Sequence, residues 1–220
     1  MKSRFIPLCL SVSFGAVCSL QAASISWSSL LAEDNPIDGL IDEGEGAIST
    51  AGTLVVAENL GGNAITWDGV DFAAGTTSFG STYADFYNNS AANQLFDTGT
   101  YSGSAANLNL SGLVIDQTYL VELVLADARA AQEGRTVVVD GEDPIQFAYN
   151  GNDTFWPARI IRGTFTADAT TQQISIQTFN VGGSSAGSQL NAYQLRAIPE
   201  PSSFALIGLG GLGFILRRRR

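Results

Sequence analysis

The sequence contains no histidine, and its two cysteines, Cys9 and Cys18, both lie within the first 23 residues. Histidine is the usual general base and the commonest metal ligand of proteins. The rest of the chain also has no thiol for a disulfide, a thiolate metal site or a cysteine nucleophile. These absences exclude a serine–histidine–aspartate triad and a histidine-based zinc site.

Basic residues are also few, with 11 Lys and Arg against 21 Asp and Glu and a net charge of −10. Two of the basic residues lie in the first 23 residues and four end the chain, whereas only Glu200 of the acids lies beyond residue 197. Residues 24–197 therefore contain five arginines and twenty acids, for a net charge of −15. A surface of this sign repels nucleic acid, so no nucleic-acid partner is expected.

The first 23 residues have the parts of a secretory signal peptide. Lys2 and Arg4 give a positive start, a mostly apolar stretch follows, and small residues near Ala23 offer a cleavage site. A lipoprotein signal ending at Cys18 is the weaker alternative, because no small residue directly precedes that cysteine. We expect export through the inner membrane.

The other end of the chain, residues 198–220, combines three features. Pro199, Glu200 and Pro201 form a rigid extended segment, because proline fixes φ and donates no N–H. Residues 204–216 are all apolar or glycine, and as a helix they would rise about 20 Å, approaching the roughly 30 Å of a hydrocarbon core once flanking residues are counted. A terminal cluster that would stay cytoplasmic follows: Arg217, Arg218, Arg219 and Arg220. A membrane-anchoring helix fits this pattern better than a core helix or strand of a soluble domain.

These three parts, paired with an N-terminal signal, resemble the PEP-CTERM sorting signal of exported bacterial proteins. The resemblance implies recognition by an exosortase, a membrane cysteine protease, with cleavage near Pro199, Glu200 and Pro201. That motif would be a substrate site and not a catalytic one. The resemblance further implies transient anchoring in the membrane, then a cell-surface or extracellular destination in bacteria that make exopolysaccharide.

Residues 24–197 have the size of one domain with its own core. Short segments of alternating polarity between Gly-, Asn-, Thr- and Ser-rich connections indicate an all-β fold, which we expect to be a single antiparallel, jelly-roll-like β-sandwich. Asp68-Gly69 and Asp140-Gly141 each predict a β-hairpin, since type I′ turns favour this pair. Residues 118–126 are apolar on both faces and predict a central strand. Residues 189–197 predict the last strand.

The order of segments over residues 108–196 is similar to a β-sandwich module of exported PEP-CTERM proteins, itself similar to galactose-binding-like jelly rolls. It runs from Tyr-Leu-Val-Glu-Leu through Asp-Ala-Arg and Arg-Gly-Thr-Phe-Thr-Ala-Asp to Leu-Asn-Ala-Tyr-Gln-Leu-Arg. This similarity implies a fold more than a function. Within the stretch, Asp127, Arg129 and Arg135 are expected to form a structural ion-pair cluster rather than a binding site.

Two groups of residues are candidates for ligand contacts. Trp156 lies in a polar stretch before a proline, and Tyr83, Tyr87 and Asn89 lie close together in a loop-rich region. Aromatic faces stack on sugar rings and amides bind hydroxyl groups, so these residues could contact a polysaccharide. The competing interpretation is that they close one end of the sandwich and pin a long connection to the core.

An acidic, glycine-containing stretch includes Asp34, Asp38 and Asp42. Oxygen ligands of this kind suit calcium, although the spacing is not that of an EF-hand. A solvated loop is the other interpretation. No cofactor besides this calcium is expected.

Two functions therefore remain from the sequence, and neither is enzymatic. The first is an exported, exosortase-processed surface or matrix protein with a structural or adhesive role among exopolysaccharides. The second is a carbohydrate-binding module, with calcium as a helper. A glycosidase would need only two carboxyl groups, but no pair among the acids is singled out.

Overall fold

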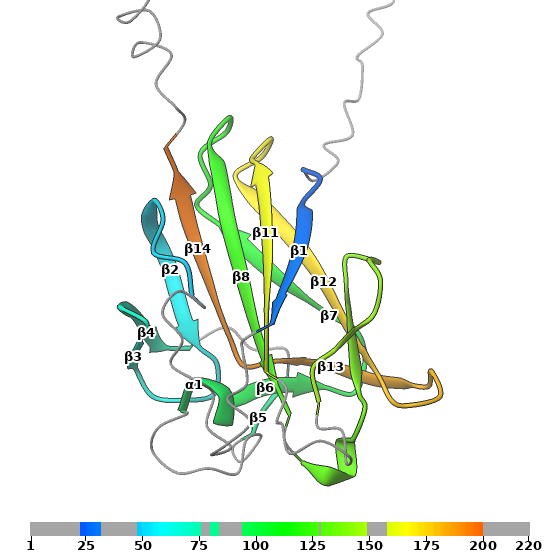
Figure 1. Ribbon diagram of the computed structural model, residues 1–220. Coiled ribbons are helices and arrows are strands. Elements are labelled where there is room, and N and C mark those ends of the chain that lie inside the picture. Colours follow the sequence, from blue (N-terminus) through cyan, green and yellow to red (C-terminus); the bar gives the residue numbers. More distant parts are fainter. Residues whose placement is uncertain are drawn as a thin grey trace, which may run out of the picture.

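The computed structural model describes residues 23–31, 48–75, 80–83, 94–127, 129–148 and 158–199, and these residues are mostly β-strand (Figure 1). The first sheet contains, in spatial order, β1 (Ser26–Leu31), β11 (Ala158–Thr166), β8 (Thr118–Ala126), β14 (Ala192–Ile198), β2 (Thr53–Asn59), β4 (Val70–Ala74) and β3 (Ile65–Trp67). The second contains β10 (Ile145–Gln146), β9 (Thr136–Val139), β12 (Thr171–Phe179), β13 (Ser185–Leu190), β6 (Gly99–Ser102) and β5 (Ser81–Tyr83), with β7 (Ala106–Ser111) also paired to β12. Two short helical turns complete the described elements, α1 (Gln94–Asp97) and the 3-10 turn η1 (Ala130–Gln132).

The prediction of a central strand over residues 118–126 is confirmed by β8, which lies between β11 and β14. One face of β8 contributes Val121 and Leu123 to the main core, where they meet Ile174 and Ile176 of the second sheet. The main core therefore lies between the two sheets. The opposite face of β8 is also covered, because Val124 belongs to a second cluster with Trp67, Phe96 and Ile160. Burial on both sides explains why this strand is apolar throughout.

Both aspartate–glycine hairpins are present. Asp68 and Gly69 have φ values of 47° and 72° and connect β3 directly to β4. Asp140 and Gly141 have φ values of 50° and 80°, but pairing between β9 and β10 begins only at Ile145. This connection is longer than a two-residue turn because Pro144, directly before Ile145, has no N–H to donate to a strand ladder.

The expected last strand over residues 189–197 is wrong as a single element. The chain divides at Asn191 into β13 and β14, which belong to different sheets. The buried Asn191 side chain holds this corner by donating to the carbonyls of Phe96 and Thr98 (2.7 and 2.9 Å) and accepting from the Ala126 N–H (2.9 Å). The Asn191 backbone also stays paired, because its N–H donates to the Val124 carbonyl (3.0 Å) and its carbonyl accepts from the Leu60 N–H (2.8 Å). The side-chain bonds therefore add to the backbone bonds at this corner.

The fold also departs from a purely antiparallel arrangement in one strand pair. β2 and β4 run parallel, with Glu58 beside Ala73 and Asn59 beside Ala74. The chain leaves β2, forms the β3–β4 hairpin and returns beside its own starting strand. Strands β5 and β6 were not predicted, because both lie in the loop-rich region of Tyr83, Tyr87 and Asn89, which extends over residues 75–104.

A buried carboxylate lies on the first sheet. Glu122 of β8 has no exposed surface, and it accepts hydrogen bonds from Arg162 Nε (2.6 Å), the Ser49 N–H (3.0 Å) and the Gln194 side-chain amide. An ion pair with Arg162 accompanies these bonds. Strands β8, β11 and β14 are therefore joined to the segment before β2 by polar contacts as well as by their ladders.

The Arg196 side chain of β14 binds the backbone of the segment before β2. Its guanidinium donates to the carbonyls of Thr50 (3.0 Å), Ala51 (2.7 Å) and Gly52 (3.2 Å). Three acceptors in a row satisfy most of the donors of a side chain that is 8% exposed. The approach to β2 is consequently held against the last strand of the domain.

Replacing Gly187 with alanine is expected to lower the free energy of unfolding by about 2 kcal/mol or more. Gly187 has a φ of 87°, and a β-carbon there would overlap the Ser102 carbonyl oxygen of β6. Gly182→Ala is the matched control, because Gly182 has a φ of 94° but no atom within 4 Å of that position. The control should cost only about 1 kcal/mol, from the backbone conformation alone. Urea unfolding of both variants measures the difference, and equal losses would contradict the close approach of β13 and β6.

Candidate functional site

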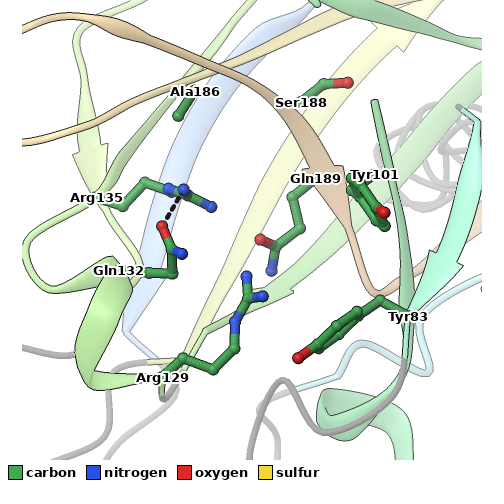
Figure 2. Close-up of a pocket in the computed structure, with 8 residues that line it drawn as sticks. All are labelled: Tyr83, Tyr101, Arg129, Gln132, Arg135, Ala186, Ser188 and Gln189. Atoms are coloured by element: carbon green, nitrogen blue, oxygen red, sulfur yellow. Dashed lines mark hydrogen bonds between the residues drawn. The ribbon is translucent and has the colours of Figure 1, made fainter. Parts of the chain in front are cut away.

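A cavity of about 250 Å³ lies at the end of β8, where the chain passes into η1 (Figure 2). Its walls come from β5, β6 and β13 of the second sheet and from the connection around η1. Eight of the described residues line it: Tyr83, Tyr101, Arg129, Gln132, Arg135, Ala186, Ser188 and Gln189.

The cavity is organised around Asp127, which directly follows β8. Strand periodicity places Asp127 on the same side as Leu125, two residues earlier and part of the main core. Asp127 is fully buried, and its backbone bridges Ala148 in parallel. An ionised carboxylate at such depth needs charged partners close by.

Two arginines supply these partners. Arg129 donates from Nε to Asp127 Oδ1 (2.8 Å) and from Nη2 to Asp127 Oδ2 (2.7 Å), so the two side chains form a bidentate ion pair. Arg135 Nη1 lies 3.5 Å from Oδ2. The Arg129 guanidinium also lies 4.6 Å from the centre of the Tyr83 ring, within cation–π range. The prediction of an ion-pair cluster at Asp127, Arg129 and Arg135 is confirmed.

The two guanidinium groups respond oppositely to this environment. Burial acts to lower the pKa of Arg129, but hydrogen bonding and charge attraction from Asp127, with smaller contributions from Tyr83, raise this pKa on balance. Burial lowers the pKa of Arg135, attraction to Asp127 opposes the change, and repulsion from Arg129 adds to it. Both side chains stay charged at neutral pH, because the ordinary value for arginine is so high.

Gln189 of β13 faces the cavity between the arginines and the tyrosines (Figure 2). Its side chain is 1% exposed, and its amide nitrogen donates to the Ala126 carbonyl (2.7 Å). Its amide oxygen is buried and has no hydrogen-bond partner among the described residues. A buried acceptor without a partner is costly, and a donor entering the cavity would relieve that cost.

The tyrosines form the opposite wall. Tyr83 and Tyr101 meet edge to face, with ring centroids 6.3 Å apart and planes at 84°. Tyr101 is 43% exposed, so part of this residue is accessible to a ligand. Of the residues predicted to contact a ligand, Tyr83 is therefore placed in the cavity.

Sequence reasoning missed Tyr101, Gln132 and Gln189. The one available signal was Gln189, a polar residue at the start of the expected last strand. Tyr101 and Gln132 gave no local signal, because their partners come from distant parts of the chain.

Of the remaining predicted site residues, Pro199 alone lies in the described part of the chain. Pro199 is exposed and directly follows β14. The others lie outside the described residues: Asp34, Asp38, Asp42, Tyr87, Asn89, Trp156, Glu200, Pro201 and Arg217, Arg218, Arg219 and Arg220. Within the described ranges no three acidic residues are grouped so as to hold a metal ion. The same ranges contain no helix long and apolar enough to cross a membrane.

Residues 197–220 match the family model of the PEP-CTERM protein-sorting motif. The match confirms the predicted PEP-CTERM sorting signal, and it begins one residue earlier than the predicted boundary. It includes Pro199, Glu200 and Pro201, whose role in processing stays a prediction. It implies an exported protein that is anchored transiently in the membrane and processed by an exosortase. No curated protein matches the chain.

Similar solved structures belong to longer proteins. The extracellular domains of ANXUR2 and ANXUR1 from Arabidopsis thaliana are each 15% identical, with TM-scores of 0.47 and 0.46, and the match covers 67% of this chain and 49% of theirs. A calcium-binding mutant of β-glucuronidase 2 from Bacteroides uniformis is 17% identical with a TM-score of 0.44, covering 66% of this chain and 18% of that one. The chain thus spans half or less of their length.

Proposed function

We propose that this exported PEP-CTERM protein is a non-enzymatic component of the cell surface or extracellular matrix. Residues 24–197 would be displayed as a single, largely antiparallel β-sandwich with a structural or adhesive role among exopolysaccharides. The main core supports this unit, because side chains of both sheets meet in it.

The observation that carries the proposal is where the sorting motif begins. Strand β14 ends at Ile198, and Pro199 follows immediately. Gln117 donates to the Ile198 carbonyl (2.7 Å), so the strand is held to its last residue. Cleavage near Pro199, Glu200 and Pro201 would therefore separate the tail without removing any strand.

A second candidate function, saccharide binding, is favoured by the cavity at Asp127. The cavity offers an exposed aromatic face on Tyr101, charged donors on Arg129 and Arg135, and an unpaired acceptor on Gln189. Polar groups of both kinds beside an aromatic wall are the usual means of orienting a small polar ligand. Saccharide binding would also give the surface protein its adhesive property.

Retention by exopolysaccharide tests this function. Full-length protein, purified in detergent, should co-sediment with the polysaccharide of an exopolysaccharide-producing bacterium, and Tyr101→Ala should reduce the bound fraction several-fold if the cavity is responsible. Ile115→Ala is the control, because Ile115 is 52% exposed and does not line the cavity. Repeating the measurement with excess calcium and with a chelator tests the proposed calcium assistance. No retention under any of these conditions would contradict the adhesive function.

A further inference from the structure

The cavity at Asp127 has a charge opposite to that of the domain around it. Residues 24–197 carry a net charge of −15, yet two of their five arginines line this one cavity. None of the eight lining residues is acidic, because Asp127 lies behind the arginines and does not contribute to the wall. A positively lined cavity in an acidic domain favours an anionic group over a neutral one.

One of the two arginines also has a donor left for a carboxylate. A guanidinium presents five N–H donors in a planar fork that matches two carboxylate oxygens. Arg135 uses Nη1 for Asp127 and Nη2 for Gln132 and Asn180, while its Nε is buried without a hydrogen-bond partner among the described residues. An entering acceptor would satisfy that donor.

A simple anion would leave the rest of the cavity unused. The unpaired oxygen of Gln189 accepts a hydrogen bond and so requires a donor, which a carboxylate does not have. A hydroxyl group on the ligand would supply the donor. The ligand should therefore carry a carboxylate and at least one hydroxyl group.

Figure 2 shows the tyrosine side chains across the cavity from Arg135, with Gln189 between them. A flat apolar face on the ligand would lie against the Tyr101 ring, since this residue is 43% exposed. The volume of about 250 Å³ is below the roughly 300–1,000 Å³ of pockets for drug-sized ligands, which limits the occupant to about one ring.

We propose that the cavity binds one acidic sugar unit, a uronate, within or at the end of a polysaccharide. The carboxylate faces Arg135 and Arg129, a ring hydroxyl donates to Gln189, and the ring lies against Tyr101. This assignment rests on the saccharide-binding function proposed above and adds its specificity.

Titration calorimetry of the full-length protein in detergent tests the specificity with D-glucuronate, D-glucose and acetate. Glucuronate and glucose differ only at the carboxylate, and acetate carries the carboxylate without the ring. Glucuronate should bind at least about tenfold more tightly than either, because a charge-assisted hydrogen bond is lost with glucose and the ring contacts are lost with acetate.

Two variants locate the binding. Arg135→Gln should weaken glucuronate about tenfold or more while leaving glucose unchanged, and Tyr101→Ala should weaken both sugars. Arg159→Gln is the matched control, because it changes the net charge equally and Arg159 does not line the cavity. Thermal unfolding of each variant verifies that the fold is retained.

Several results would overturn the assignment. Equal affinity for glucose and glucuronate, or an Arg135→Gln variant that binds glucuronate as tightly as the natural protein, would show that the cavity does not recognise the carboxylate. Equal affinity for acetate and glucuronate would reduce the cavity to a general anion site. If neither sugar binds while the polysaccharide is still retained, the uronate assignment fails and the adhesive function stands. If the polysaccharide is not retained either, both the uronate assignment and the adhesive function are wrong.

Discussion

Replacing Glu122 with alanine is expected to lower the free energy of unfolding by about 3 kcal/mol. Removing one partner of a buried ion pair typically costs about 3–5 kcal/mol. The lower end applies here because the Arg162 side chain keeps 26% of its surface exposed and can turn towards water. The Ser49 N–H and the Gln194 amide lose their acceptor at the same time. Equilibrium unfolding in urea gives this difference from the shift in midpoint.

Two further variants test whether the loss of stability comes from the hydrogen bonds of Glu122 and not simply from removing an acidic residue. Glu122→Gln keeps the shape but turns one oxygen into a donor that must face Arg162 or Ser49, so it should cost about 1–2 kcal/mol. Glu142→Ala, at an exposed position, should stay within about 0.5 kcal/mol of the natural protein. A Glu122→Ala variant as stable as Glu142→Ala would show that the polar contacts are not needed for stability.

Replacing Pro199, Glu200 and Pro201 together with alanine should leave nearly all of the chain unprocessed in the membrane. The reason is twofold, since the substitution removes the sorting motif and also the two rings that keep the segment extended. Immunoblots of membrane, surface and medium fractions measure the full-length and shortened forms.

The neighbouring serines provide the matched control. Ser202→Ala combined with Ser203→Ala changes a segment just beyond the motif but preserves the prolines and the acid. This double variant should be processed normally. If the triple variant is shortened and released at the normal rate, the prediction of processing near Pro199 is wrong.

The features that the sequence predicted well are local ones. The type I′ turn at Asp68-Gly69 depends on two adjacent residues, and the central position of residues 118–126 depends on apolar side chains at successive positions of one strand. Asp127, Arg129 and Arg135 lie within nine residues of one another, so their attraction could also be anticipated. Short-range patterns of this kind need no knowledge of the fold.

The features that failed depend on distant contacts. The alternation of residues 189–197 continues through Asn191, and only the carbonyls of Phe96 and Thr98 explain why the chain turns there. The cavity likewise joins Tyr83, Arg129 and Gln189 from separate strands and connections. No local pattern in any of these segments indicates the others.

The central position of β14 determines how the domain would respond to tension. It pairs with β8 on one side and β2 on the other, while β1, at the edge of the same sheet, pairs only with β11. Drag from fluid or polymer on an anchored molecule would enter at Pro199 and run along β14. Because both neighbours are aligned with that pull, their hydrogen bonds would be sheared together instead of peeled apart one by one. Until the tail is cleaved, the chain would thus be tethered through a strand that is hard to extract by force.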